Sequence, residues 1–170
     1  MLVFLTGFMA AGKSSVGRLL SERLQARYLD LDEEIEAQAG MSIAEIFSRR
    51  GEAAFRQLES EVLMTATRLS HAVVATGGGV VIHEANVRAM RSAGKVVWLD
   101  TPFETMAARL TAFETKKRPL FKSGDAARKI YSSRLAAYEN CDWRIDIGPE
   151  ESPEAVAGRI LRWLEDECGT

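Results

Sequence analysis

The stretch GFMAAGKS, residues 7–14, decides how this sequence folds. It fits the P-loop pattern G-x-x-x-x-G-K-S/T, in which the backbone N–H groups of a glycine-containing loop converge on the phosphates of a nucleotide. The apolar run Leu2–Thr6 precedes it and is typical of a buried strand, whereas Val16, Leu20 and Leu24 follow at helical spacing. The motif therefore lies where its chemistry requires, between a strand and the positive N-terminal end of a helix.

Two side chains of this motif have distinct tasks. Lys13 is expected to neutralise the β and γ phosphates, and the Ser14 hydroxyl is expected to bind Mg²⁺. Glycine at the first and sixth positions of the motif lets the loop wrap closely around an anion. The predicted nucleotide-binding residues of this loop are Gly7, Ala10, Ala11, Gly12, Lys13, Ser14 and Ser15.

A nucleotide site of this kind also needs a carboxylate to help hold the metal, and it commonly lies at the end of a strand. A D-x-D pattern, with acids at Asp30 and Asp32, follows a short apolar run. Such a pattern at a strand end splays its two acids, so we expect Asp30 to join Ser14 at the metal and Asp32 to face the phosphoryl acceptor. Asp100 also follows an apolar run, but we interpret it as a helix N-cap or turn residue.

Short apolar runs alternate with longer amphipathic stretches along the rest of the chain, which indicates strands separated by helices. The runs lack the alternation of half-exposed strands, so we expect a parallel sheet that helices cover on both faces. A length of 170 residues corresponds to about one domain. Together with the P-loop, the apolar runs predict a single α/β P-loop domain over residues 1–170, with a five-stranded sheet. Ser42 and Glu45 have the spacing of a helix capping box. The predicted strands are Leu2–Thr6, Tyr28–Leu31, Val73–Ala75, Val96–Leu99 and Trp143–Ile147.

Composition and charge exclude several classes of function. Apolar residues make up 46% of the chain and charged residues 27%, which is ordinary for a folded domain with a sizeable core. The net charge of −2 argues against a constitutive nucleic-acid binder, and no stretch suits a membrane span or a signal peptide. Cys141 and Cys168 lack the spacing of metal or redox sites. We expect a cytoplasmic monomer with no nucleic-acid or membrane partner.

Positive charge is concentrated in one segment. Residues 109–134 contain eight Lys and Arg residues and two acidic ones, although the whole chain is slightly acidic. Such a cluster is typical of a segment that faces a small anion, although a solvated helix face has the same composition. Residues 111–124 within it are polar, basic and without periodicity, so we predict a mobile lid there.

Further motifs follow the P-loop in a fixed order. They are Asp30 and Asp32, Ile46-Phe47, Gly51-Glu52, Phe55-Arg56 with Glu59, Val73–Gly79, Arg118-Pro119-Leu120, and Arg134 with Tyr138. The stretch from Arg56 through the three glycines is the most specific of these. Together with GFMAAGKSSVGRLL at residues 7–20, these motifs resemble the shikimate kinase family over nearly the whole chain.

This resemblance implies an enzyme that transfers the γ-phosphoryl group of ATP to the 3-hydroxyl of shikimate, with Mg²⁺, on the route to chorismate and the aromatic amino acids. Asp32 would hydrogen-bond the substrate hydroxyls and accept the proton of the attacking one. Arg56 and Arg134 would hold the substrate carboxylate. The acceptor-binding region would span about residues 32–60.

The resemblance also assigns a glycine turn and two further arginines. Gly77, Gly78 and Gly79 would line the acceptor pocket with backbone. Arg118 would be a catalytic arginine on the lid that reaches both ATP and the transferring phosphoryl group, alongside Lys13 and Asp32. Arg109 would pack near the adenine of ATP.

The residue types suit these roles on physical grounds. A guanidinium grips a carboxylate through two parallel hydrogen bonds, and glycine lets backbone amides come close to a substrate. Without the resemblance, Arg56 could equally be a surface residue that pairs with Glu59 or Glu61. Ala10 stands where many family members carry glycine, which we expect to be harmless provided that its φ stays below zero.

Two other kinds of function stay open. The chain could be an ATP-dependent kinase for another small acid such as gluconate, or for a nucleoside monophosphate. It could also be a non-catalytic, kinase-like domain that binds ATP or shikimate and regulates a partner. The presence of Lys13, Asp32 and Arg118 favours an enzyme over a regulator.

Overall fold

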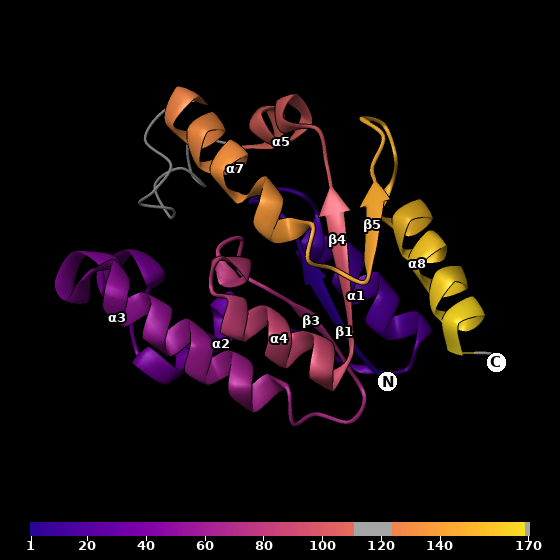
Figure 1. Ribbon diagram of the computed structural model, residues 1–170, viewed down its shortest axis with the longest axis horizontal. Coiled ribbons are helices and arrows are strands. Elements are labelled where there is room, and N and C mark those ends of the chain that lie inside the picture. The colour runs from indigo at the N-terminus through magenta and orange to yellow at the C-terminus, as the bar shows by residue number, and fades with distance from the viewer. Residues whose placement is uncertain (111–123, 169–170) are drawn as a thin grey trace.

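The computed structural model describes residues 1–110 and 124–168, and its centre is a sheet of five parallel strands (Figure 1). The strand order across the sheet is β2-β3-β1-β4-β5, so the first strand lies in the middle. This confirms the five-stranded parallel sheet that the apolar runs predict. The strands are β1 (Leu2–Thr6), β2 (Arg27–Asp30), β3 (Ala72–Ala75), β4 (Lys95–Asp100) and β5 (Trp143–Asp146).

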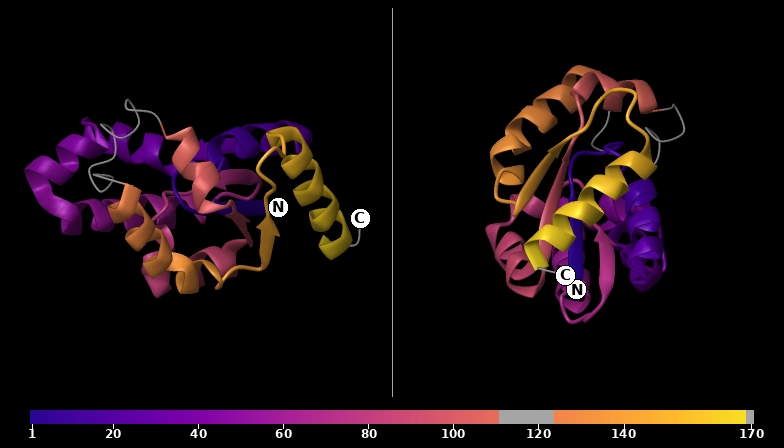
Figure 2. Two further views of the ribbon diagram at one scale, coloured as in Figure 1. Left: turned by 90° about the horizontal axis from the view of Figure 1, so that it is seen from above. Right: turned by 90° about the vertical axis from the view of Figure 1, so that its right-hand side faces the viewer.

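Helices cover both faces of the sheet. The helices are α1 (Lys13–Arg23), α2 (Leu31–Ala39), α3 (Ile43–Ala66), η1 (Val80–Ile82, a 3₁₀ turn), α4 (Glu84–Ala93), α5 (Phe103–Arg109), α7 (Gly124–Tyr138) and α8 (Pro153–Cys168). Figure 2 shows α1 and α8 on one face, with α4 and α7 on the other, while α2 and α3 extend past the β2 edge. Within the described part of the chain, no helix combines the length and the apolar character that crossing a bilayer requires.

The middle of the sheet forms the core. Every residue of β1 is buried, and Val3, Phe4 and Leu5 have no exposed surface. A parallel strand that helices cover on both sides has no solvent face, which explains why its sequence is a continuous apolar run. The adjacent strand β3 is buried throughout for the same reason.

The register of the strands aligns the chain segments that follow them. Ala75 at the end of β3 pairs with Leu5 of β1 on one side and with Asp30 of β2 on the other. The loops after these three strands therefore leave the sheet at the same edge. After β1 the chain crosses to β2 at one edge of the sheet, whereas after β3 it crosses to β4 on the other side of β1. Ligands of parallel sheets bind at such a switch point.

Local signals set the start of α2 and α3. The Asp30 carboxylate accepts a hydrogen bond from the Asp32 backbone N–H (3.1 Å) and caps α2. The strand predicted at Tyr28–Leu31 therefore ends one residue early, because Leu31 already belongs to the helix. The predicted capping box is confirmed, with Ser42 N–H donating to the Glu45 carboxylate at 3.0 Å.

The interpretation of Asp100 as a helix cap or turn residue was wrong. It is the last residue of β4, and its carboxylate pairs with Arg144 of β5 at 2.7 Å. The N-cap position of α5 is Pro102, which makes no side-chain cap. The pairing of β4 with β5 brings these charges together, and no local pattern around Asp100 records it.

Gly94, between α4 and β4, lies where the backbone leaves no room for a side chain. A Cβ on Gly94 would lie 2.2 Å from the Leu2 carbonyl oxygen, which belongs to the central strand and cannot rotate away. We expect Gly94→Ala to destabilise the protein by about 1–3 kcal/mol, the usual cost of overpacking a core. Urea unfolding at equilibrium measures this difference.

Gly158→Ala is the matched control, because its Cβ would meet only the ends of two flexible side chains, Arg23 at 3.1 Å and Arg162 at 3.7 Å. Replacement of glycine by alanine inside a helix favours the folded state by up to about 1 kcal/mol. Equal midpoints for Gly94→Ala and the wild type would contradict the close contact.

Candidate active site

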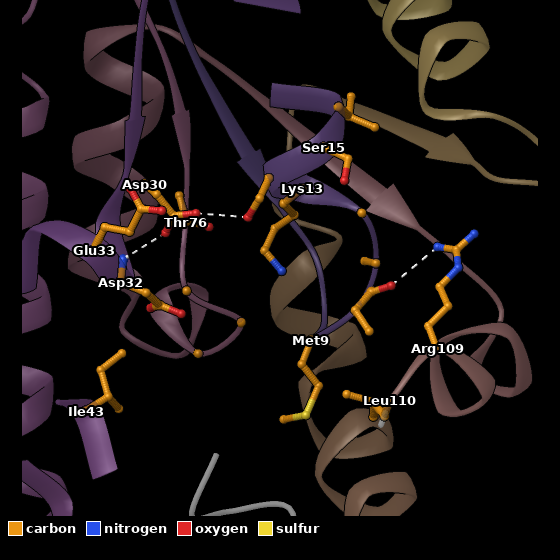
Figure 3. Close-up of a pocket in the computed structure, with 18 of the residues that line it drawn as sticks. Met9, Lys13, Ser15, Asp30, Asp32, Glu33, Ile43, Thr76, Arg109 and Leu110 are labelled. Carbon is orange, nitrogen blue, oxygen red and sulfur yellow. Dashed lines mark hydrogen bonds between the residues drawn. The ribbon is translucent and has the colours of Figure 1, made fainter. Parts of the chain in front are cut away.

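A cavity of about 760 Å³ opens at the sheet edge where β1, β2 and β3 end (Figure 3). Its walls come from segments that are far apart in the sequence, namely the P-loop, the start of α2, α3, the turn after β3, α7 and the segment that precedes α8. The volume suits a nucleotide phosphate group together with a small second ligand. Phe47 and Phe55 of α3 also line it, with ring centroids 4.7 Å apart.

The P-loop adopts a backbone conformation that glycine favours. Gly7 has φ 141°, and a Cβ there would lie 2.8 Å from the Leu99 carbonyl oxygen of β4. Gly12 also has positive φ. Ala10 has φ 58°, so the condition under which alanine would be harmless at this position is not met. The left-handed conformation costs an alanine roughly 1–2 kcal/mol, and it is retained because the loop wraps in this way around an anion.

Lys13 lies against the inside of the P-loop. Its ammonium donates to the carbonyl oxygens of Gly7 and Phe8, at 2.8 Å each. Arg109, at the end of α5, donates to the Ala10 carbonyl oxygen at 3.3 Å and so borders the same loop (Figure 3). Two cations and the start of α1 therefore surround the loop, which makes it attractive to a polyanion.

Ser14 and Asp30 lie together, as the sequence predicts. The Ser14 hydroxyl donates to the Asp30 carboxylate at 2.9 Å, and the Tyr28 hydroxyl donates to the same oxygen at 3.1 Å. Burial raises the pKa of Tyr28, and the adjacent Asp30 raises it further, so this phenol stays a donor. Sequence reasoning did not identify Tyr28, because nothing local marks its reach to the acid.

These oxygens fit Mg²⁺ in their chemistry. Hydroxyl and carboxylate oxygens are hard donors, and Mg²⁺ in kinases is held by one or two protein oxygens together with phosphates and water. Among the residues that the structure describes, no group of three or more His, Cys, Asp or Glu side chains could hold a metal. A site with few protein donors is what a metal that arrives with a nucleotide needs.

Asp32 lies in the first turn of α2 and lines the cavity. Figure 3 shows its side chain and that of Lys13 projecting into the cavity from different walls. The two acids of the D-x-D pattern are separated because the backbone changes from strand to helix between them, rather than by the pleat of a strand. The sequence predicted the different directions of the two acids but not this cause.

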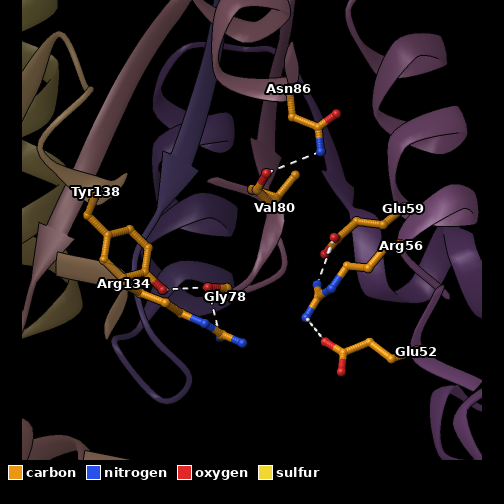
Figure 4. A network of polar contacts seen from close by, with 8 residues as sticks. All are labelled: Glu52, Arg56, Glu59, Gly78, Val80, Asn86, Arg134 and Tyr138. Atoms are coloured by element: carbon orange, nitrogen blue, oxygen red, sulfur yellow. Dashed lines mark hydrogen bonds and ion pairs between the residues drawn. The ribbon is translucent and has the colours of Figure 1, made fainter. Parts of the chain in front are cut away.

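Arg56 belongs to a buried ion pair on α3 (Figure 4). Its guanidinium lies 2.8 Å from the Glu59 carboxylate, whose side chain is 1% exposed, and 3.2 Å from Glu52 at the rim. The alternative of a surface pair is therefore wrong, because Arg56 does pair with Glu59 but the Glu59 side chain is buried. Phe55 and Val62 flank Glu59 at helical spacing and are buried, and this periodicity was the signal that Glu59 faces inward.

The second oxygen of Glu59 makes no hydrogen bond within the described residues. A Cβ on Gly77 would lie 2.9 Å from this oxygen and 3.0 Å from an oxygen of Asp32. Glycine at this position therefore lets two carboxylates approach the cavity wall. Burial raises the pKa of Glu59 despite the opposing charge of Arg56, and Asp32 raises it further.

The other two glycines of the turn contact arginines. The Gly78 carbonyl oxygen accepts from the Arg134 guanidinium at 3.2 Å and from the Tyr138 hydroxyl (Figure 4). A Cβ on Gly79 would collide with the Arg56 guanidinium. The turn thus separates Arg56 on α3 from Arg134 on α7.

Arg134 is buried, with 8% of its surface exposed. Burial lowers its pKa, Tyr138 raises it, and the positive charge of Arg56 lowers it again. Figure 4 shows both guanidinium groups directed to the same side of the glycine turn. A buried and a partly buried cation that repel each other form a site for an anion, and paired guanidinium groups suit a carboxylate or a phosphate.

The structure gathers nearly all predicted site residues around this one cavity. The cavity-lining members are Ala10, Ala11, Gly12, Lys13, Ser14, Ser15, Asp30, Asp32, Arg56, Gly77, Gly78, Gly79, Arg109 and Arg134. Gly7 lies at the base of the P-loop and is absent from the lining. Arg118 and the predicted lid residues 111–123 lie outside the described residues, and Gly124 begins α7.

Comparison with known proteins gives a consistent match. The family model for shikimate kinase matches residues 9–165. A shikimate kinase of Geobacter metallireducens is 45% identical over 166 residues, which are 96% of this chain and 91% of the relative. A shikimate kinase of Aquifex aeolicus is 40% identical over 166 residues, which are 97% of this chain and 96% of the relative.

A solved structure is similar over the same extent. The shikimate kinase from Acinetobacter baumannii in complex with shikimate superimposes with a TM-score of 0.92 at 34% identity. The match covers 98% of this chain and 93% of that chain. Fold and sequence similarity therefore both extend over nearly the whole length.

The buried Glu59 predicts a pH-dependent stability. A carboxyl whose pKa is raised in the folded protein contributes stability that is fully present below the unfolded pKa of about 4.5 and lost as the pH rises through the folded pKa. Replacement by glutamine removes this titration. We therefore expect the free energy of unfolding of Glu59→Gln minus that of the wild type to rise between about pH 5 and about pH 8.

Urea unfolding at the two pH values measures this change. Glu52→Gln is the control, because Glu52 contacts the same arginine but its side chain is 53% exposed. Its difference from the wild type should change less between the two pH values. A pH-independent difference for Glu59→Gln would contradict the raised pKa.

Proposed function

Because the chain belongs to the shikimate kinase family, we propose that the cavity at the β1–β3 edge is where shikimate and ATP react. The protein is an ATP-dependent kinase that transfers the γ-phosphoryl group of ATP to the 3-hydroxyl of shikimate, which yields shikimate 3-phosphate and ADP. This reaction belongs to the pathway that makes the aromatic amino acids. The alternatives of a gluconate kinase and of a regulatory domain lack this support.

One observation carries the assignment of the acceptor site. Arg56 and Arg134 come from different helices and direct their guanidinium groups to the same side of the glycine turn (Figure 4). Asp32 lies at the same turn, next to Gly77. Two guanidinium groups and one carboxylate complement a ligand with one carboxylate and several hydroxyls. We assign Arg56 and Arg134 to the shikimate carboxylate and Asp32 to its hydroxyls.

The P-loop holds the nucleotide in this proposal. Backbone N–H groups and the N-terminal end of α1 bind the β and γ phosphates, and the Lys13 ammonium moves from the loop carbonyls to the phosphate oxygens. Arg109, beside Ala10, is assigned to the adenine side of the nucleotide. Arg118 is assigned to the transferring phosphoryl group on the basis of its sequence motif alone.

Ser14 and Asp30 would hold Mg²⁺. The ion bound there would neutralise charge that develops on the phosphate oxygens. Asp30 already accepts hydrogen bonds from Ser14, Tyr28 and the Asp32 backbone, so its carboxylate is oriented before any ligand arrives. This orientation supports a role in binding the ion directly or through water.

In the chemical step, the γ-phosphoryl group and the hydroxyl proton are transferred to different acceptors. The 3-hydroxyl oxygen of shikimate forms a bond to the γ phosphorus, and the bond from that phosphorus to the bridging oxygen of ADP breaks. The hydroxyl proton passes to the Asp32 carboxylate, and ADP leaves with the electron pair of the broken bond. Lys13 stabilises the charge on the phosphate oxygens, and the two acceptor arginines keep the ring in place.

The proposal also covers the acceptor region, the lid, the oligomeric state and the compartment. The acceptor region spans about residues 32–60, and residues 111–124 act as a lid over the reacting groups. The protein works as a monomer in this proposal. It works in the cytoplasm, where ATP is supplied.

A coupled assay of ADP release tests the function. We expect ADP release with shikimate as acceptor and little release with gluconate, with a nucleoside monophosphate or with no acceptor. Turnover only with gluconate or with the nucleotide would identify a different kinase. No turnover with any acceptor would favour a regulatory domain.

A substitution tests the role of Asp32. We expect Asp32→Asn to lower kcat by about 10²–10⁴-fold, because an amide cannot take the proton of the attacking hydroxyl. The Kd for ATP should stay within about twofold, because Asp32 lies on the acceptor side of the cavity. Steady-state kinetics and nucleotide titration measure these values.

Glu34→Gln is the matched control, because Glu34 is an exposed acid in the same first turn of α2. Its kcat should equal that of the wild type. A wild-type kcat for Asp32→Asn would remove Asp32 from proton transfer.

A further inference from the structure

We propose that Tyr138 is a positioning residue whose hydroxyl holds the Gly78 carbonyl, so that Arg134 can turn from this carbonyl to the carboxylate of the acceptor. The proposal rests on the function proposed above, in which Arg134 binds that carboxylate. It assigns to Tyr138 a role in acceptor affinity rather than in nucleotide binding or chemistry.

Two donors of α7 share one acceptor. Arg134 and Tyr138 lie one helical turn apart, and both donate to the carbonyl oxygen of Gly78. Both side chains are buried, with exposed fractions of 8% and 1%. A carbonyl oxygen has two lone pairs, so the two bonds together satisfy it fully.

Arg134 has a second task that competes with this bond. A guanidinium grips a carboxylate best with two parallel N–H groups, but one terminal nitrogen of Arg134 is used at Gly78. The bond to Gly78 uses only one of the five N–H groups, but it fixes the direction of the guanidinium. When Arg134 turns to align two parallel N–H groups with the acceptor carboxylate, this bond is released. A partly buried carbonyl left without a donor is destabilising, and the Tyr138 hydroxyl continues to donate to it.

The phenol is suited to hold this bond alone. Its ring stacks on Trp98 of β4, with centroids 5.6 Å apart and planes inclined by 17°, so the sheet fixes the direction of the hydroxyl. Burial raises the pKa of Tyr138, which keeps the hydroxyl protonated. Tyr138 can therefore donate to Gly78 both when Arg134 is bound to this carbonyl and when it has turned away.

The glycine turn is also anchored at its other end. Asn86 of α4 is buried and donates to the Val80 carbonyl oxygen at 3.1 Å (Figure 4). On its inner side Gly78 faces the P-loop, because a Cβ there would lie 3.4 Å from the Met9 backbone nitrogen. With Tyr138 and Asn86 in place, the turn keeps two anchors after Arg134 leaves.

The test is Tyr138→Phe, which keeps the ring and its stacking on Trp98 and removes only the hydroxyl. We expect the Kd and KM for shikimate to rise about tenfold, because Arg134 then becomes the sole donor to Gly78 and is held back. The KM for ATP and kcat at saturating shikimate should stay within about twofold. Calorimetric titration and steady-state kinetics measure the two sets of values.

Tyr131→Phe is the matched control. Tyr131 lies on the same helix, and its hydroxyl contacts Asp100 at 3.4 Å, away from the glycine turn. It should leave both KM values unchanged. An unchanged shikimate Kd in Tyr138→Phe, or equal rises in the KM values for shikimate and ATP, would overturn the proposal.

A double-mutant cycle separates action through Arg134 from a general loosening of the fold. In an Arg134→Lys background, Tyr138→Phe should change the shikimate Kd by less than about twofold, because the guanidinium that it frees is absent. A full tenfold change in that background would refute action through Arg134. If the wild type itself neither binds shikimate nor turns it over, the proposed function fails, whereas normal wild-type activity with an unaffected Tyr138→Phe variant refutes this inference alone.

Discussion

The common direction of the five strands is the constraint on which the site depends. Parallel strands send the segments after β1, β2 and β3 out at one edge, and the register Leu5–Ala75–Asp30 brings those segments level. The P-loop, the acids of α2 and the glycine turn meet there for that reason alone. An antiparallel partner would place one of these segments about the length of a strand away.

The electrostatics of the site follow from burying charges of both signs near one turn. Arg56 and Arg134 form the positive site that we propose for the acceptor carboxylate, and Glu59 holds Arg56 in place at the cost of its own burial. Burial of an ion pair stabilises a fold weakly, so its value lies in orienting the guanidinium. An anionic ligand would offset the repulsion between the two arginines and tighten the whole cluster.

The glycine turn joins the parts of the site mechanically. Gly77 admits two carboxylates, Gly79 admits Arg56, and the Gly78 carbonyl binds α7 through Arg134 and Tyr138. Side chains at these positions would separate α3 and α7 from the sheet edge. The backbone of three residues thereby sets the distance between α3 and α7, which carry the two arginines, while the P-loop lies against its other side.

The sequence alone determined the P-loop, the five strands, the capping box at Ser42 and about half of the residues that line the cavity, because these depend on local spacing and on motifs. Contacts between distant segments were decided only by the tertiary structure. It made Asp100 the partner of Arg144, put Ala10 in the left-handed region, and buried Glu59 against Arg56. It also directed Tyr138 to Gly78, 60 residues away in the chain. A sequence pattern indicates which face of a helix is buried, but not which carbonyl or charged group of another element that face contacts.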